Sequence, residues 1–112
     1  MKAVVIKRFG SSDVLEYEYN YLKPEILKNQ VLIKVNAAGV NPLDIRTREG
    51  QLRLFTGSRF PIILGNDVSG VIEECGSEVR NFKPGDQVYG MVDSYEVDYH
   101  WKSVLHTSKN ML

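Results

Sequence analysis

Three side chains that could take part in chemistry lie close together in the sequence, between Asn41 and Arg46. The amide of Asn41 can both donate and accept hydrogen bonds, whereas the carboxylate of Asp44 only accepts them. Arg46 is a permanent cation, so it could stabilise an oxyanion that develops on a substrate. The chemistry available to this group is therefore hydrogen bonding and charge stabilisation.

Each of these side chains also has a purely structural interpretation. Asn41 precedes Pro42 and is a favoured residue at a helix N-cap, a role that does not exclude a second one toward a ligand. Asp44 could be a solvated carboxylate on a helix. Arg46 could be an ordinary surface arginine. At the level of the sequence these alternatives stay open.

The residues from Asn41 to Gly50 predict a short helix or helical turn that would position the three side chains. Asn41 stands at the N-cap, Pro42 at the first helical position, and Gly50 just past the end. The next residues, 51–59, show no clear period and are predicted to form a loop. Such a loop could border a site.

Short β-strands are predicted along most of the remaining chain. The segment 16–21 alternates acidic residues with tyrosines, which is typical of a strand with one face covered. Glycines interrupt the segment 62–74, and they suit bulges and close backbone approach in a curved sheet. The predicted strands comprise residues 3–6, 16–21, 31–35, 62–74, 87–90 and 103–105.

A turn signal and the number of strands together indicate the fold class. Lys83-Pro84-Gly85-Asp86 predicts a type II turn, because glycine tolerates the positive φ that its third position requires. Many short strands, frequent glycines and a single helical signal favour a mostly β fold, a partly open Greek-key β-barrel with one or two short helices. Near the C-terminal end an aromatic cluster is interpreted as packing at the barrel mouth rather than as an interface: Tyr95, Tyr99 and Trp101.

The composition is that of one globular domain covering residues 1–112. Lys and Arg number 14 and Asp and Glu also number 14, so the positive surplus that favours nucleic acid or an anionic membrane is missing. No nucleic-acid or membrane partner is therefore expected, and a small molecule or a protein is favoured. No apolar stretch reaches the length of a signal or membrane segment.

Cys75 is the only cysteine and cannot pair within the chain. It is compatible with a reducing compartment, and we predict a cytoplasmic location. Cys75, His100 and His106 could be imagined as a metal set, but their spacing fits no known metal-site pattern. Solvated histidines are the preferred interpretation.

Three stretches match one known family in order and spacing: A-G-V-N-P-L-D at 38–44, L-G-N-D-V-S-G-V-I-E at 64–73 and F-K-P-G-D-Q-V-Y-G at 82–90. Together they resemble the N-terminal, GroES-like domain of the medium-chain dehydrogenase/reductase superfamily. The combination is more specific than each piece alone. The resemblance covers residues 1 to about 90. The family's mostly β barrel is the fold that it implies.

The resemblance also bears on metal binding. The zinc-dependent alcohol dehydrogenases carry Cys where this chain has Asp44 and His where it has Asn66. A neutral Asn is a poor substitute for imidazole or thiolate as a zinc ligand. The four-cysteine structural zinc lobe is missing as well. The resemblance therefore implies a zinc-free member of the quinone oxidoreductase type, which reduces quinones or α,β-unsaturated carbonyls.

In that branch of the family NADPH supplies a hydride, and the protein supplies orientation and electrostatics. By resemblance, Asn41 would lie at the nicotinamide and substrate side of the cleft, and Asp44 at the cleft floor in the vacated ligand position. Arg46 stands where relatives often have Ser, Thr or Tyr. Asn66 and Asp67 are expected to be structural, with Asp67 bonding backbone groups near the cleft.

A nucleotide-binding Rossmann domain is absent from this chain. No Gly-x-Gly-x-x-Gly follows a strand, and no βαβ unit can be drawn. We therefore expect the chain alone to bind NADPH weakly and to be inactive. The former domain interface would then leave apolar surface uncovered, which could drive self-association.

Two other functions stay open. The first is a free-standing GroES-like protein-interaction module without catalysis, in which the residues from about Asp93 would be a purpose-built ending. The second is a zinc-binding alcohol dehydrogenase domain, which Asp44 and Asn66 disfavour.

Overall fold

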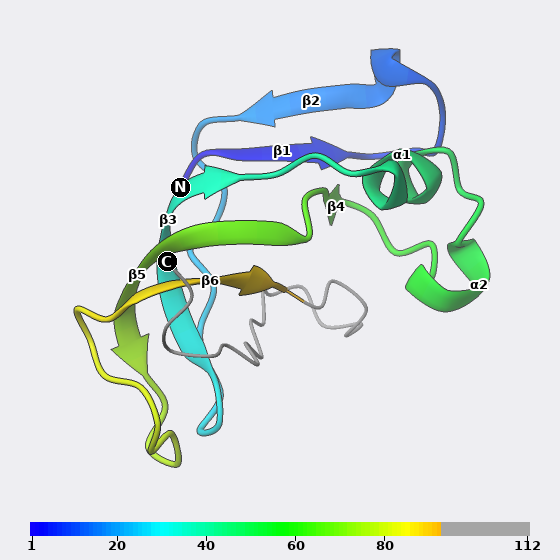
Figure 1. Cartoon of the computed structure of the whole chain (residues 1–112). Coiled ribbons are helices and arrows are strands. Elements are labelled where there is room, and N and C mark those ends of the chain that lie inside the picture. The colour runs from blue at the N-terminus through cyan, green and yellow to red at the C-terminus, as the bar shows by residue number, and fades with distance from the viewer. Residues whose placement is uncertain (93–112) are drawn as a thin grey trace.

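Two antiparallel sheets of three strands each make up the computed structural model of the chain, in which residues 1–92 are described (Figure 1). The first sheet has the order β2-β1-β4 and the second β3-β5-β6. The predicted mostly β fold with one or two short helices is confirmed. The predictions for the aromatic cluster, for both histidines, for the strand at 103–105 and for the ending from Asp93 lie outside the described residues.

The first sheet is built around the apolar N-terminal strand β1 (Ala3–Ile6). It pairs on one side with β2 (Leu15–Glu18) and on the other with β4 (Ile62–Ile63). A 3₁₀ turn, η1 (Ser12–Val14), joins β1 to β2. Val5 and Ile6 are fully buried, so β1 supplies the apolar interior of this sheet.

The second sheet consists of the long strands β3 (Val31–Ala38) and β5 (Asp67–Cys75) and the shorter β6 (Gln87–Met91). Every second residue of β5 from Val68 to Ile72 is buried, the period of a strand with one face on a core. The buried cluster here is formed by Val31, Val68, Ile72, Val88 and Val92.

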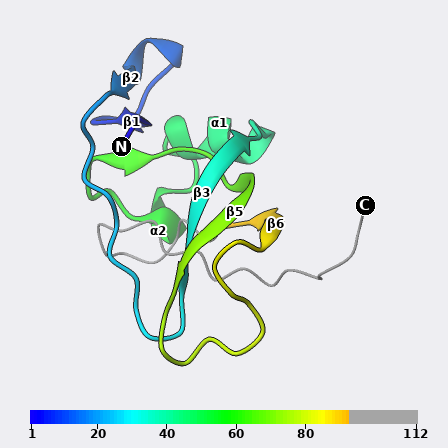
Figure 2. The same cartoon turned by 90° about the vertical axis from the view of Figure 1, so that its left-hand side faces the viewer.

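Two short helices lie together at one end of the sheets, and the turn between β5 and β6 lies at the opposite end (Figures 1 and 2). They are α1 (Pro42–Arg48), which follows β3, and α2 (Arg53–Thr56). None of the helices within residues 1–92 has the length and apolar character needed to cross a membrane.

The predicted caps of α1 and the predicted type II turn at 83–86 are both confirmed. Asn41 is the N-cap of α1, Pro42 is its first residue, and Gly50 follows its end with a φ of 77°. Gly85 has a φ of 93°, and the backbone N–H of Asp86 donates to the carbonyl of Lys83 at 3.1 Å, as a type II turn requires.

Three predicted segments differ from the structure. The strand predicted at 62–74 is divided into β4 and β5, which belong to different sheets. The strand predicted at 16–21 ends at Glu18, which pairs with Ala3 at the start of β1. Beyond it the backbones of Tyr21 and Met1 still bond each other, outside the two strands. The side chains of β2 are mostly exposed, so the expected covered face is wrong. The loop predicted at 51–59 contains α2, a single helical turn too short to give a visible period.

The lone thiol of Cys75 is partly buried at the end of β5. It donates to the carbonyl of Phe82 at 3.6 Å. Burial, and to a smaller extent the negative charge of Asp86, raises the pKa of the Cys75 thiol. A raised pKa means little thiolate at neutral pH, so this cysteine lacks the character of a reactive nucleophile.

Candidate functional site

The carboxylate of Asp44 ties the first turn of α1 to a distant loop. One oxygen, Oδ2, accepts from the backbone N–H of Asn41 at 2.7 Å, and the Asn41 side chain accepts from the backbone N–H of Asp44, which completes a capping box. The other, Oδ1, accepts from the backbone N–H of Gly65 at 3.1 Å. Asp44 is only 5% exposed. The alternative of a solvated helix carboxylate is therefore wrong, because both oxygens are used inside the fold.

The side chain of Asn41 is held by a second carboxylate. Its Nδ2 donates to Oδ2 of Asp67, the first residue of β5, at 2.6 Å. Asn41 is half-buried, so part of it faces the surface. The side chain of Asp67 was expected to bond backbone groups. That expectation is wrong, because its partner is the carboxamide of Asn41. The resemblance did not indicate this pair.

Arg46 is not brought together with the other two candidates. It lies two positions after Asp44 on α1, and residues two apart do not share a helix face. Its side chain is exposed, and no hydrogen bond or ion pair joins it to another residue of 1–92. The structure thus places Asn41, Asp44 and Asp67 in one cluster and leaves Arg46 on the surface.

Glycines complete this cluster. The backbone N–H of Gly39 donates to the carbonyl of Asp67 at 2.9 Å, and a Cβ on Gly39 would lie 3.3 Å from the Cβ of Asp67. Gly65 has a φ of 107°, in the region that favours glycine. Neither Gly39 nor Gly65 was predicted as part of the site. The only available signal was their place two positions before Asn41 and Asp67 in the matched stretches.

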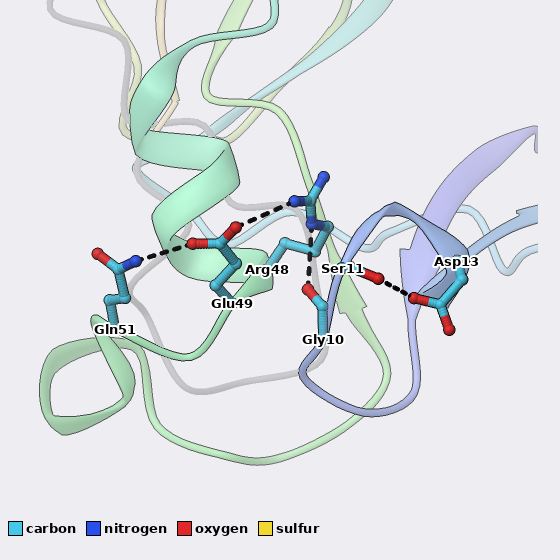
Figure 3. A network of polar contacts seen from close by, with 6 residues as sticks. All are labelled: Gly10, Ser11, Asp13, Arg48, Glu49 and Gln51. Carbon is cyan, nitrogen blue, oxygen red and sulfur yellow. Dashed lines mark hydrogen bonds and ion pairs between the residues drawn. The ribbon is translucent and has the colours of Figure 1, made fainter.

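The other end of α1 is anchored as well (Figure 3). Nε of Arg48 donates to the carbonyl of Gly10 at 3.2 Å, and the backbone N–H of Gly10 donates to the carbonyl of Arg48 at 3.0 Å. Glu49 accepts from both Arg48 and Gln51, while Ser11 bonds Asp13 in the neighbouring loop. The helix that carries Asn41 is therefore fixed at both ends.

Replacing Arg48 by alanine is expected to lower the free energy of unfolding by about 1.5 kcal/mol. The change removes a mostly buried guanidinium from the Gly10 carbonyl and leaves that acceptor without its donor. Arg46→Ala, on the same helix, is the matched control and should cost less than about 0.5 kcal/mol. Urea unfolding followed by circular dichroism measures both. Equal losses in the two variants would contradict an anchoring role for Arg48.

The donor atoms of the site do not fit a catalytic zinc ion. Both oxygens of Asp44 accept backbone N–H groups, and Asn66 offers a neutral amide. Within residues 1–92 no three His, Cys, Asp or Glu side chains gather closely enough to hold a metal ion.

An apolar cavity of about 560 Å³ lies between the two sheets, next to the polar cluster. Its lining includes Ala38, Leu64 and Val68, the sequence neighbours of Gly39, Gly65 and Asp67, but not Asn41 or Asp44. The cavity therefore adjoins the cluster without containing its hydrogen-bonding groups.

Comparisons with known proteins bear on what this arrangement serves. The family model described as alcohol dehydrogenase GroES-like domain matches residues 27–104. NAD(P)H oxidoreductase RTN4IP1, mitochondrial, of Bos taurus is 42% identical over 109 residues, which cover 86% of this chain and 28% of the relative. NADPH-dependent alkenal/one oxidoreductase, chloroplastic, of Arabidopsis thaliana is 47% identical over 92 residues, which cover 82% of this chain and 24% of the relative.

A solved structure of a related oxidoreductase also has a similar fold. The quinone oxidoreductase from Coxiella burnetii superposes with a TM-score of 0.77 at 37% identity, covering 92% of this chain and 33% of that one. In each case the chain spans about a third or less of the length of the protein that it matches.

Proposed function

The chain belongs to the family of alcohol dehydrogenase GroES-like domains, and on that premise we propose that it is the substrate-side domain of an NAD(P)H-dependent oxidoreductase. The proposed reaction is zinc-independent hydride transfer to a quinone or an α,β-unsaturated carbonyl. Relatives named as a quinone oxidoreductase and as an alkenal/one oxidoreductase support this choice of acceptor. The observation that carries the proposal is the half-buried Asn41, whose carboxamide is bonded to Asp67 while Asp44 holds its main chain.

The residues of the site fall into those that would contact the cofactor or acceptor and those that hold these contacting residues in place. NADPH, when bound, supplies the hydride. Asn41 fits the nicotinamide side, because the residue is only half-buried and a carboxamide can bond an amide or a carbonyl. Asp44 holds the backbone of Asn41 and does not itself react, since both its oxygens are engaged. Arg46, an exposed cation on the same helix, would stabilise negative charge on the acceptor.

The phosphates of NADPH would need a glycine-rich turn at a helix N-terminus, and no such motif occurs in these 112 residues. We therefore propose that this chain holds only the nicotinamide end, binds NADPH weakly and catalyses nothing alone.

A second proposal concerns the exposed apolar side chains beside the site, Val40 (84% exposed), Leu54 (91%) and Phe55 (77%). They would lie against a nucleotide-binding domain or support self-association. A cytoplasmic location stays a prediction.

A chimeric enzyme tests the proposed function. Residues 1–92 of this chain replace the matching segment of the Coxiella burnetii quinone oxidoreductase, and NADPH oxidation is followed with 1,4-benzoquinone and with a simple enone. The chimera is expected to reduce at least one acceptor, while the chain alone reduces neither. Asn41→Ala should lower kcat about tenfold or more, the loss expected when an orienting hydrogen bond disappears.

Two outcomes would contradict the proposal. One is a folded chimera that binds NADPH but transfers hydride to neither acceptor. The other is stoichiometric zinc by elemental analysis of the chain, which would restore the metal-dependent alternative. Arg46→Ala in the chimera adds a separate test, since unchanged kinetics would remove Arg46 from the site.

A further inference from the structure

The hydrogen bond between Asn41 and Asp67 joins two elements that are far apart in the sequence. Nδ2 of Asn41 and Oδ2 of Asp67 are 2.6 Å apart, and the residues are separated by 26 positions. A bond of this length with an ionised acceptor belongs to the strong, charge-assisted class. It connects the N-cap of α1 to the first residue of β5.

The chemistry of the pair fixes the direction of the carboxamide. An ionised carboxylate only accepts hydrogen bonds, so the NH₂ end of Asn41, and not its oxygen, must face Asp67. A free surface asparagine can rotate its amide by half a turn and exchange the two ends. Here the oxygen accepts from the backbone N–H of Asp44 in the capping box, so the second N–H of the carboxamide is the group that keeps a fixed place at the half-buried Asn41.

Asp67 is itself firmly held. Its backbone pairs with Met91 of β6, and its carbonyl accepts from the N–H of Gly39 at 2.9 Å. A Cβ on Gly39 would lie 3.3 Å from the Cβ of Asp67 and 3.8 Å from its Oδ2, so the absence of a side chain there leaves room for the carboxylate. On the other side, Asp44 fixes the backbone of Asn41.

We infer that Asp67 is a positioning residue, which sets the orientation of the Asn41 carboxamide toward the bound nicotinamide or acceptor without touching either. The inference rests on the proposed function, because it gives Asn41 a ligand. The inference also assigns a different role to each carboxylate: Asp44 holds the main chain of Asn41, and Asp67 holds its side chain.

The first test uses the ¹⁵N-labelled 112-residue chain and the side-chain amide signals of Asn41 in NMR spectra. In the unchanged chain one of the two amide protons is expected to be shifted away from the free value and protected from solvent exchange. Asp67→Asn keeps the size of the side chain but offers only a neutral acceptor, so it should move both signals part of the way toward the free values. Asp13→Asn, the same chemical change at an exposed carboxylate, should leave them in place.

The second test uses the chimera. Asp67→Asn should lower kcat about tenfold, the effect of losing one charge-assisted hydrogen bond, while the KM for NADPH changes little. The exchanged pair, Asn41→Asp with Asp67→Asn, restores the charge-assisted hydrogen bond, with the donor now at position 67. It should restore the Tm lost in Asp67→Asn but not kcat, because a carboxylate now stands at position 41.

The outcomes separate the inference from the proposed function. An unmutated chimera that reduces no acceptor overturns the function, whereas unchanged Asn41 amide signals in Asp67→Asn overturn the inference in the chain itself. Full recovery of kcat in the exchanged pair would show that Asp67 serves stability alone, and would likewise overturn it.

Discussion

Gly70→Ala is expected to lower the free energy of unfolding by at least about 3 kcal/mol, because the site has no room for a methyl group. A Cβ on Gly70 would lie 2.2 Å from the carbonyl oxygen of Lys34 and 2.9 Å from Cγ2 of Ile33. Gly70 pairs with Val35 on one side and Val88 on the other, beside a register shift in β3. Relief of the clash would have to separate β3 from β5.

Gly85→Ala is the matched control for this result. Gly85 has a φ of 93°, but nothing lies within 4 Å of the position of its Cβ. Only the backbone strain of a side chain at positive φ remains, about 1 kcal/mol. Urea unfolding of the two variants and the unchanged chain gives the comparison. If Gly70→Ala cost no more than Gly85→Ala, the close approach of β3 and β5 would be wrong.

Asp44→Ala is expected to lower the free energy of unfolding by about 3 kcal/mol. It removes a buried carboxylate and leaves the backbone N–H groups of Asn41 and Gly65 without their acceptor, at roughly 1–3 kcal/mol for each. For a chain of this size the Tm should fall by roughly 12 °C or more. Differential scanning calorimetry measures the change.

Two further variants sharpen the Asp44 experiment. Asp44→Asn keeps the shape but turns an NH₂ group toward one of the two N–H donors, so it should recover less than half of the loss. Asp13→Ala removes an exposed carboxylate and should cost less than about 0.5 kcal/mol. A loss in Asp44→Ala as small as that in Asp13→Ala would falsify the structural role given to Asp44.

Features that depend on neighbouring residues were predicted well from the sequence. The start of α1 at Asn41 and Pro42 and its end before Gly50 follow from capping preferences, which act within a few residues. The turn at Gly85 follows from the same kind of local requirement. The strands at 3–6 and 87–90 were recovered nearly to the residue, because short β-branched runs bounded by turns have few alternatives.

Segments that depend on a distant partner were predicted less well. The alternation in 16–21 continues past Glu18, but the regular pairing with β1 stops at Ala3 and Glu18, and only the backbone contact between Tyr21 and Met1 follows within the described residues. The alternation also indicated a covered face, and most of β2 is exposed. The helix α2 arises where the N–H groups of Phe55 and Thr56 bond the carbonyl of Leu52, a single turn without a periodic signal.

The sequence by itself determined the fold class, the family resemblance and the presence of Asn41 and Asp44 on one short helix. Only the tertiary structure decided what their side chains contact. Asp44 meets Gly65 across 21 positions, and Asn41 meets Asp67 across 26. Capping preferences and hydrophobic periods report interactions within a turn or a strand, whereas these contacts exist only once β3, α1 and β5 are packed together. Burial of Asp44 and the direction of the Asn41 carboxamide are therefore properties of the packed fold.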